Sequence, residues 1–311
     1  MTQKFVLTLM VLTLSACIQV RDPEADKAQS PEVTPGVPKM GARVTPLPQA
    51  QTYLVQMDGV PKGAQIQRFS INEKGQKIVE PLEKPEDVVK KAGPQEYAIL
   101  EAGKPEQRLQ VNIPEDVVIT GLQRVSKLKL QDMAPNAWGL EKHFRVTGRL
   151  YFQGSSALIT EGQKVLIEAD TIESEGATLQ SFSQDQLLVI NADGRHGGLI
   201  YLKSRELKGT LQVNMYGQSS ELQNFLLPDQ RNHGFSGGSS GQLVIDIENL
   251  NFGRVRYQAL PGKGGEGKEV HALCWGGCPN PILKPAGPKG QDGVAQAACW
   301  LRHGRCEELR D

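Results

Sequence analysis

Short runs in which apolar residues alternate with polar ones recur along the middle of the chain, and glycine bounds them. Runs of period two predict β-strands, and no long helical period interrupts them. The clearest strands are predicted at 110–113, 117–119, 165–167, 187–190, 199–202 and 243–247. Residues 109–260 are therefore expected to form an all-β domain of a mainly β protein.

A local pattern repeats inside this domain. Apolar residues that face one side of a strand stand two and four positions after Gly148, Gly209 and Gly253. An apolar strand also stands nine residues ahead of Gly176, as it does ahead of the last two glycines. The glycine spacings of 28, 33 and 44 residues are uneven, but a solenoid tolerates insertions on one face. We expect β-solenoid rungs with glycine at the corners; the alternative is a β-sandwich or jelly-roll.

The region before this domain, residues 51–108, predicts a small α+β or β capping region. Strands are expected at 52–57 and 97–100, with Asp58-Gly59 as a turn after the first. A short helix is expected to open at Pro85 and to stop near Gly93.

The region after it, residues 261–311, is rich in glycine and proline. Residues 287–293 have the Gly-x-y spacing of collagen. Two triplets are too few for a triple helix, so a flexible loop is expected there. Residues 295–309 are expected to form a short helix or a cap.

The beginning of the chain has a different pattern. Lys4 precedes an apolar run to Leu14 and the small residues Ser15 and Ala16, which are the three parts of a secretory signal peptide. The run is about half of the ~20 apolar residues that a spanning helix needs. The first six prolines of the chain fall within residues 18–50, so 17–50 is expected to be a disordered tether.

The sequence Leu14-Ser15-Ala16-Cys17 resembles the lipobox of bacterial lipoproteins. The resemblance covers only the first seventeen residues. It implies cleavage after residue 16, a diacylglycerol on the Cys17 thiol and further acylation, and two or more acyl chains anchor a protein stably. The alternative is an ordinary signal peptide that contains a cysteine. Residue 18 is Ile rather than the Asp that retains enteric lipoproteins at the inner membrane, which favours the outer membrane.

Charge and composition exclude some partners. The 35 basic and 35 acidic residues give no net charge, so nucleic acid is not an expected partner. Aromatic residues are only 5% of a chain with 33 glycines, which favours a turn-rich β fold over a helical enzyme. No cofactor is implied.

Four cysteines remain once Cys17 carries lipid: Cys274, Cys278, Cys299 and Cys306. An even number clustered in an exported chain predicts disulfides. Three pairings are possible, and the short-loop pairing of the first two and the last two is our interpretation. A zinc site is the alternative, although neither spacing matches the usual C-x2-C pairs.

Catalytic patterns are weak. Residues 234–238 fit the letters G-x-S-x-G around Ser236, but no helix pattern follows, so a loop is expected. Asp193 to His196 is a polar cluster that first predicts a turn, and none of the five histidines has metalloprotease spacing. Three acids and four aromatic residues are further candidates for a sugar site: Asp170, Glu173, Glu175, Tyr201, Tyr216, Tyr257 and Trp275. The aromatic residues are expected mainly in the core or at strand edges.

These patterns predict a lipid-anchored protein of the bacterial cell envelope with a structural, adhesive or ligand-binding role and no catalysis. Its expected partners are the membrane and an envelope protein or polysaccharide. The alternative is a carbohydrate-active β-helix lyase or hydrolase, an activity that the fold alone cannot establish.

Overall fold

The computed structural model describes residues 40–71, 74–134, 136–222, 232–268, 270–271, 282–284, 286–302 and 305–308. Contacts between backbone positions separate residues 1–39 from residues 40–311, and only the second unit is described. The signal peptide, Cys17, Cys274 and Cys278 therefore lie outside the described residues. None of the helices in the described ranges is long and apolar enough to cross a membrane.

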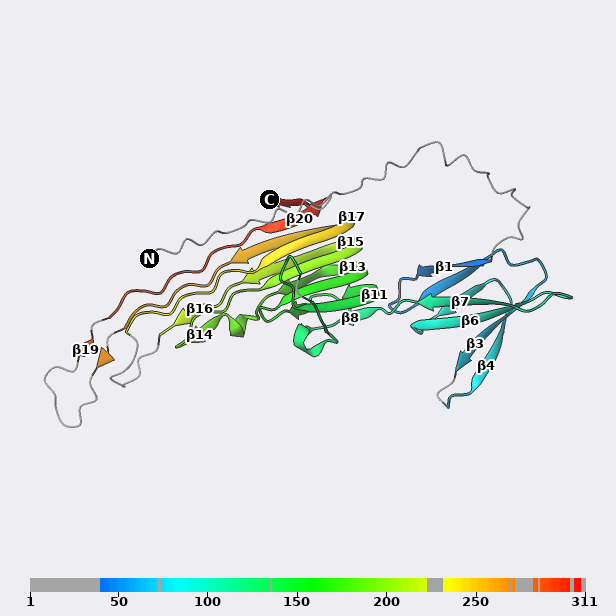
Figure 1. Ribbon diagram of the computed structural model, residues 1–311, viewed down its shortest axis with the longest axis horizontal. Coiled ribbons are helices and arrows are strands. Elements are labelled where there is room, and N and C mark those ends of the chain that lie inside the picture. Colours follow the sequence, from blue (N-terminus) through cyan, green and yellow to red (C-terminus); the bar gives the residue numbers. More distant parts are fainter. Residues whose placement is uncertain are drawn as a thin grey trace, which may run out of the picture. The chain divides into compact units, whose positions relative to one another are not determined.

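The first part of the described chain is an antiparallel β-sandwich (Figure 1). One sheet has the strand order β1-β2-β5 and the other β4-β3-β6-β7. The strands are β1 (Gly41–Pro46), β2 (Tyr53–Asp58), β3 (Gln65–Ile71), β4 (Lys77–Leu82), β5 (Glu86–Val89), β6 (Gly93–Leu100) and β7 (Gln107–Ile113). Alternate residues of these strands, such as Tyr53, Val55 and Met57, are buried between the sheets.

Three predictions for this region are corrected. Residues 86–89 form a strand, not a helix, because Asp87 is buried where Arg68 and Tyr97 hydrogen-bond its carboxylate. The tether predicted to end at residue 50 contains β1. The boundary expected at 108 falls inside β7, so the sandwich runs to Ile113.

The second part is a β-solenoid, as favoured from the sequence. Its large sheet has the order β10-β11-β13-β15-β17-β20-β21, and β11 to β20 are parallel (Figure 1). The long strands are β11 (Lys142–Phe152), β13 (Lys164–Gln180), β15 (Leu199–Tyr216) and β17 (Gln242–Leu260). The shorter elements are β8 (Val117–Ile119), β9 (Leu122–Arg124), η1 (Val125–Lys127), β10 (Gln131–Asp132), β12 (Ala157–Ile159), η2 (Gln184–Gln186), β14 (Leu188–Ile190), β16 (Ser219–Glu221), β18 (Val270–His271), β19 (Ile282–Lys284), β20 (Ala298–Arg302) and β21 (Arg305–Glu308).

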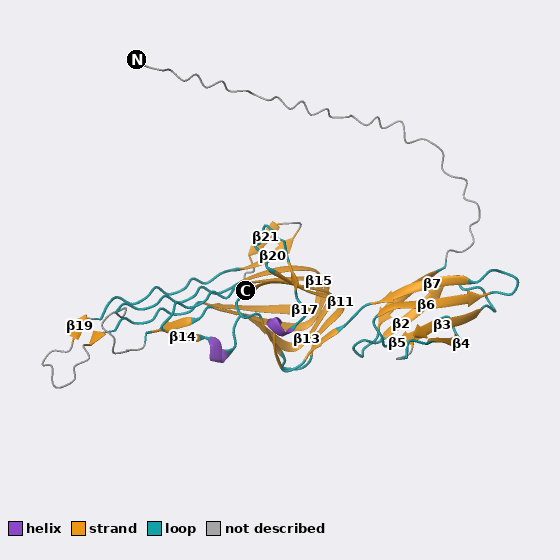
Figure 2. Cartoon of the chain, turned by 60° about the horizontal axis from the view of Figure 1, so that its bottom comes forward, coloured by secondary structure: helices purple, strands orange, loops and turns teal. Residues whose placement is uncertain are grey.

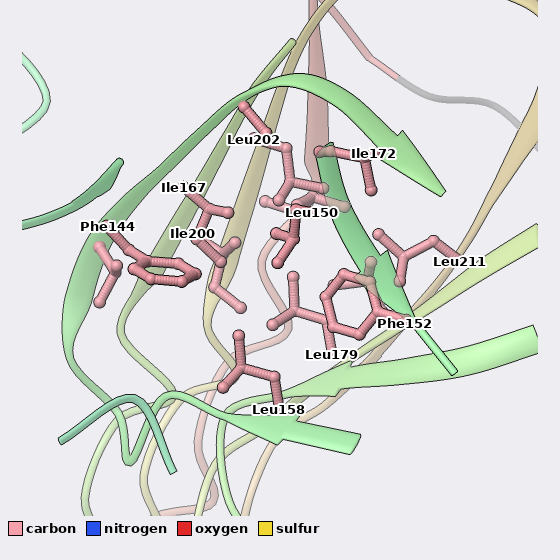
Figure 3. Close-up of a cluster of buried hydrophobic side chains, with 14 of the residues drawn as sticks. Phe144, Leu150, Phe152, Leu158, Ile167, Ile172, Leu179, Ile200, Leu202 and Leu211 are labelled. Atoms are coloured by element: carbon pink, nitrogen blue, oxygen red, sulfur yellow. The ribbon is translucent and has the colours of Figure 1, made fainter. Parts of the chain in front are cut away.

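The rungs stack in register although their lengths differ. Lys142 pairs with Val165, 23 residues later; Val165 with Ile200, 35 later; Ile200 with Leu243, 43 later; and Leu243 with Ala298, 55 later. Equivalent side chains therefore lie on one another and form apolar columns inside the solenoid. Figure 3 shows this core, to which every long strand contributes.

Glycine marks only some equivalent positions. Gly209 and Gly253 are in register, as the repeated pattern predicted, but Ser174 rather than Gly176 pairs with Gly209. Gly148 lies at a register shift in β11, where a Cβ would come within 2.5 Å of the Asp116 carboxylate. The expected repeat is therefore right in its strands and only partly right in its glycines.

The extra length of the later rungs forms a bundle of extended segments, residues 191–198, 217–221, 232–241, 262–268 and 286–297. Figure 2 shows these segments running side by side beyond the long strands. Backbone N–H groups spaced three residues apart donate to backbone carbonyls with the same spacing: Gly234 to Pro288, Gly237 to Gln291 and Ser240 to Val294. A second series runs antiparallel: Gly262 to Gly238, Gly265 to Phe235 and Lys268 to Asn232.

A period of three residues is that of polyproline II helices, which have no internal hydrogen bonds and can bond to neighbouring chains. The collagen-like spacing at 287–293 thus belongs to ordered backbone, and the predicted flexible loop is wrong. Glycine is required for close approach: a Cβ on Gly290 would lie 2.0 Å from the Phe235 carbonyl oxygen, and one on Gly234 would lie 1.7 Å from that of Gly265.

Residues 298–302 and 305–308 form a β-hairpin and not a short helix, which was one of the two alternatives expected for 295–309. β20 pairs with β21, and Cys299 is bonded to Cys306 with an S–S distance of 2.01 Å. This bond is one of the two that the short-loop pairing predicts, whereas the other falls on residues outside the described ranges.

A buried ionic cluster connects the end of the sandwich to the first rungs. The Arg149 guanidinium donates to both Asp116 and the backbone carbonyls of Leu47 and Gln49, at 2.6 to 3.1 Å. Tyr53 also donates to Asp116, whose side chain is fully buried. Burial alone would raise the pKa of Asp116, but the hydrogen bonds from Arg149 and Tyr53 outweigh it and hold that pKa below its ordinary value.

Replacement of Gly290 by Ala tests the bundle. The added methyl group meets backbone rather than a movable side chain, so the free energy of unfolding should fall by about 2–3 kcal/mol. Gly41→Ala is the matched control because nothing lies within 4 Å of its Cβ. Urea unfolding followed by circular dichroism measures both, and equal stability of the two variants would contradict the bundle.

Replacement of Asp116 by Asn tests the ionic cluster through its pH dependence. Because the folded pKa is lowered, the carboxylate stabilises the fold above its unfolded pKa of about 4 and this contribution is lost as the pH falls through the folded value. Asp116→Asn should cost about 3–5 kcal/mol at pH 7 and much less near pH 2. Asp132→Asn, at an exposed ion pair, should cost little at either pH. Thermal unfolding at both pH values checks this, and a pH-independent cost would refute it.

Candidate functional site

Three successive rungs begin with the same six-residue pattern, in which three apolar residues precede two charged residues separated by one position. The pattern occupies 165–170, 200–205 and 243–248. The register pairs Arg145 with Glu168, Glu168 with Lys203, and Lys203 with Asp246. Because alternate side chains of a strand point to opposite faces, the charges gather on the outer face in a row of alternating sign.

These residues line a groove of about 350 Å³ that crosses four parallel strands. Positive and negative side chains alternate along it from β11 to β17. Its lining consists of Arg145, Val146, Thr147, Glu168, Ala169, Asp170, Lys203, Ser204, Arg205, Asp246 and Glu248. We call this surface the charged groove.

Glu168 is the centre of the first row. Its carboxylate lies 3.2 Å from Lys203 Nζ and 4.0 Å from Arg145 Nε. His143 Nε2 lies 2.9 Å away, outside hydrogen-bond alignment. Burial would raise the pKa of Glu168, but Lys203 and His143 outweigh it, so the pKa lies below its ordinary value and Glu168 stays ionised at neutral pH.

Asp170 and Arg205 form the second row. Arg205 donates from Nε and from a terminal nitrogen to the two Asp170 oxygens, both at 3.0 Å. The Arg205 hydrogen bonds lower the pKa of Asp170 despite its partial burial, and Asp170 in turn raises the pKa of Arg205. This two-pronged geometry fixes the guanidinium plane while leaving 60% of the Arg205 side chain exposed.

An aromatic patch adjoins the charged groove at the start of the strands. Tyr201 lies edge-on to Trp138, with ring centroids 5.9 Å apart, and both are half-buried beside Leu140 and Val244. The Tyr201 hydroxyl donates to Asp246 at 3.1 Å. Burial, and then Asp246, raise the pKa of Tyr201 to about 12.

Two of the carboxyls in the groove lack the electrostatics of an acid catalyst. A glycosidase needs one carboxyl whose pKa is raised so that it can act as an acid. Glu168 and Asp170 have lowered pKa values, and Arg205, with a raised one, stays protonated. Among the described side chains, no three of His, Cys, Asp or Glu converge to hold a metal ion.

The structure brings two of the predicted clusters together, but as backbone supports. Asp193 accepts the Ser236 N–H at 2.7 Å, and His196 Nδ1 accepts the Ser239 N–H at 2.9 Å. Arg195 donates to the Glu161 carbonyl. Asp193 and His196 therefore hold two segments of the bundle together, and the polar cluster and the G-x-S-x-G window do not form a catalytic triad.

The other predicted residues are distributed among separate contacts. Of the three acids, only Asp170 lines the groove; Glu173 lies 3.5 Å from Lys208, and Glu175 accepts from Tyr151. Tyr216 is buried, and the hydroxyl of half-buried Tyr257 donates to the carbonyls of Gly241 and Gln296. Trp275 lies outside the described residues.

Sequence reasoning missed most of the charged groove. Arg145, Glu168, Lys203, Arg205 and Asp246 were not candidates. The signal that identifies them is the constant distance of the charged pair from the three apolar residues that open each rung.

Comparison with known proteins adds little. No protein-family model matches the chain, and no curated protein does. A solved structure of a pectate lyase from Erwinia chrysanthemi in complex with tetragalacturonic acid aligns with 82% of this chain and 94% of its own, at 9% identity and a TM-score of 0.18. A likeness at that TM-score carries no argument about function.

Proposed function

We propose that this chain is a lipid-anchored protein of the bacterial cell envelope, at the outer membrane, that binds an acidic polysaccharide in the charged groove without catalysing a reaction. The observation that carries the binding role is the exposure of three cations on one face: Arg145, Lys203 and Arg205 have 60%, 52% and 60% of their side chains exposed. Glu168, the partner of Arg145 and Lys203, is less exposed, at 26%, as is Asp170, the partner of Arg205, at 45%.

The spacing of these cations suits an extended polymer. Neighbouring strands lie about 4.8 Å apart, so the cations of β11 and β15, two strands apart, are separated by about 10 Å across the rungs. A rigid sheet holds them at that spacing before a ligand arrives, which lowers the cost of binding. Carboxylate or phosphate groups on alternate sugar units can meet such a row, while Tyr201 and Trp138 offer apolar ring surface to a sugar.

A second candidate function is a carbohydrate-active β-helix enzyme. It is favoured by one observation, that the charged groove gathers acids with Arg and Lys on one face of a parallel sheet. The lowered pKa values of Glu168 and Asp170 are the reason that we place it second.

Binding to alginate, with neutral dextran as the comparison polymer, tests the first proposal. The double substitution of Arg145 and Arg205 by Gln should weaken alginate binding at least tenfold and reduce its salt dependence, because two cations no longer contact the polymer. Arg43→Gln, at an exposed arginine of the sandwich that is also ion-paired, is the control. Calorimetry at two salt concentrations measures both.

Two results would oppose this proposal. Equal affinity for dextran and alginate would show that the groove does not select charge. Release of unsaturated or reducing sugars, lost on Glu168→Gln, would establish the enzyme instead.

Cys17→Ala tests the anchor. Without the thiol no diacylglycerol can be attached, so incorporation of an alkyne-tagged palmitate should be abolished and the protein should be left uncut or released from the membrane fraction. Cys278→Ala should retain full labelling. Continued labelling of the Cys17 variant would show that the lipoprotein interpretation is wrong.

A further inference from the structure

The outer edge of β17 is open over most of its length. β15 pairs with β17 along one side from Gln242 to Leu260, whereas in the described part of the chain β20 covers the other side only at Leu243–Ile245. A solenoid end normally needs a capping element, and an open strand edge is a template for another strand.

The apolar side chains at this edge are also less buried than those of the preceding rung. Val255 pairs with buried Leu211, and Tyr257 with buried Val213, yet Val255 and Tyr257 themselves are only half-buried. The N-terminal end of the solenoid, by contrast, is closed by short elements and by the Arg149–Asp116 cluster. Among the described residues, no strand pairs with this edge at Val255 or Tyr257.

The charges on this edge indicate what covers it. The rows of the charged groove alternate in sign from strand to strand and end on acids: Asp246 follows Lys203, and Glu248 follows Arg205 along the same face. Within the described residues no ion pair joins either acid to a cation, whereas Glu168 is paired with Lys203 and Arg145, and Asp170 with Arg205. A further strand that continued the alternation would place two cations, separated by one residue, beside Asp246 and Glu248.

We infer that the β17 edge beyond Ile245 binds an extended polypeptide segment of a partner protein, which adds one strand and places a basic-x-basic pair against Asp246 and Glu248. A second copy of this chain fits less well. Stacking two solenoids squarely would require the second to occupy the place that β20 takes beside Leu243–Ile245, whereas a single strand can end before it. Asp246 and Glu248 also line the charged groove, but the inference does not depend on which ligand the cations of that groove bind.

The natural neighbour of β17 supplies the probe. A labelled synthetic peptide with the sequence of residues 203–214 contains Lys203 and Arg205 in the spacing that faces Asp246 and Glu248, and it begins after the positions that would meet β20. It should bind the mature full-length protein saturably, as measured by fluorescence anisotropy. Glu248→Lys should weaken the peptide at least tenfold, and Glu83→Lys, at an exposed acid of the sandwich, should not.

Two further peptides separate strand addition from simple charge attraction. N-methylation of every second residue blocks the hydrogen bonds on one edge of a strand, so one methylation parity should abolish binding and the other should preserve it. A peptide in which only Arg205 is replaced by glutamate should regain binding to the Glu248→Lys variant, because the position of Lys203 still faces Asp246.

Some outcomes would overturn the inference. Binding that is insensitive to both methylation parities would reduce the contact to electrostatics. A dimer of the protein alone in sedimentation analysis, dissociated by the peptide, would assign the edge to a second copy. Absence of peptide binding would remove the site altogether.

Discussion

The parallel, in-register stacking of one rung on the next is the constraint on which the rest of this structure depends. Each rung must place its apolar residues on those of its neighbour, because that contact is how a solenoid buries its core. The rungs nevertheless lengthen from 23 to 55 residues. The register is kept because the additional residues of the longer rungs leave the strands and pack as a separate bundle. The bundle repeats every three residues and needs glycine where its backbones approach most closely.

The same stacking decides what the outer face can do. A residue type that recurs at one position of every rung becomes a row across the sheet, and here the recurring type is a charge whose sign alternates. Alternation lets neighbouring rungs neutralise one another, which holds Glu168 and Asp170 ionised and leaves long cationic side chains exposed. A rigid row of this kind is suited to recognising a charged polymer. It is poorly suited to acid catalysis, which needs a carboxyl that keeps its proton.

The sequence carries much of this fold but conceals part of the site. Period-two alternation locates the strands, since the predicted runs 165–167 and 199–202 are neighbours in the sheet. The spacing ahead of the glycines aligns Ile167 with Ile200, however, whereas the sheet pairs Val165 with Ile200. The short helix expected after Pro85 is wrong because Asp87 enters the sandwich core, which only its contacts with Arg68 and Tyr97 explain. The collagen-like glycines could not be interpreted locally, because their hydrogen-bond partners are up to 55 residues away in other rungs. The charged groove corresponds to three six-residue patterns in the sequence, but these patterns can be aligned with one another only when the strand register is known.

Directed disulfide formation between neighbouring rungs tests this register most directly. Thr210 on β15 and Arg254 on β17 are paired, whereas Gln258 lies four residues further along β17. With both residues replaced by cysteine, the Thr210 and Arg254 positions should form a disulfide on mild oxidation, identified by mass spectrometry of the linked peptides, and the Thr210 and Gln258 positions should not. Preferential linkage of the second pair would show that β15 and β17 are out of register in this part of the sheet, which would contradict the in-register stacking.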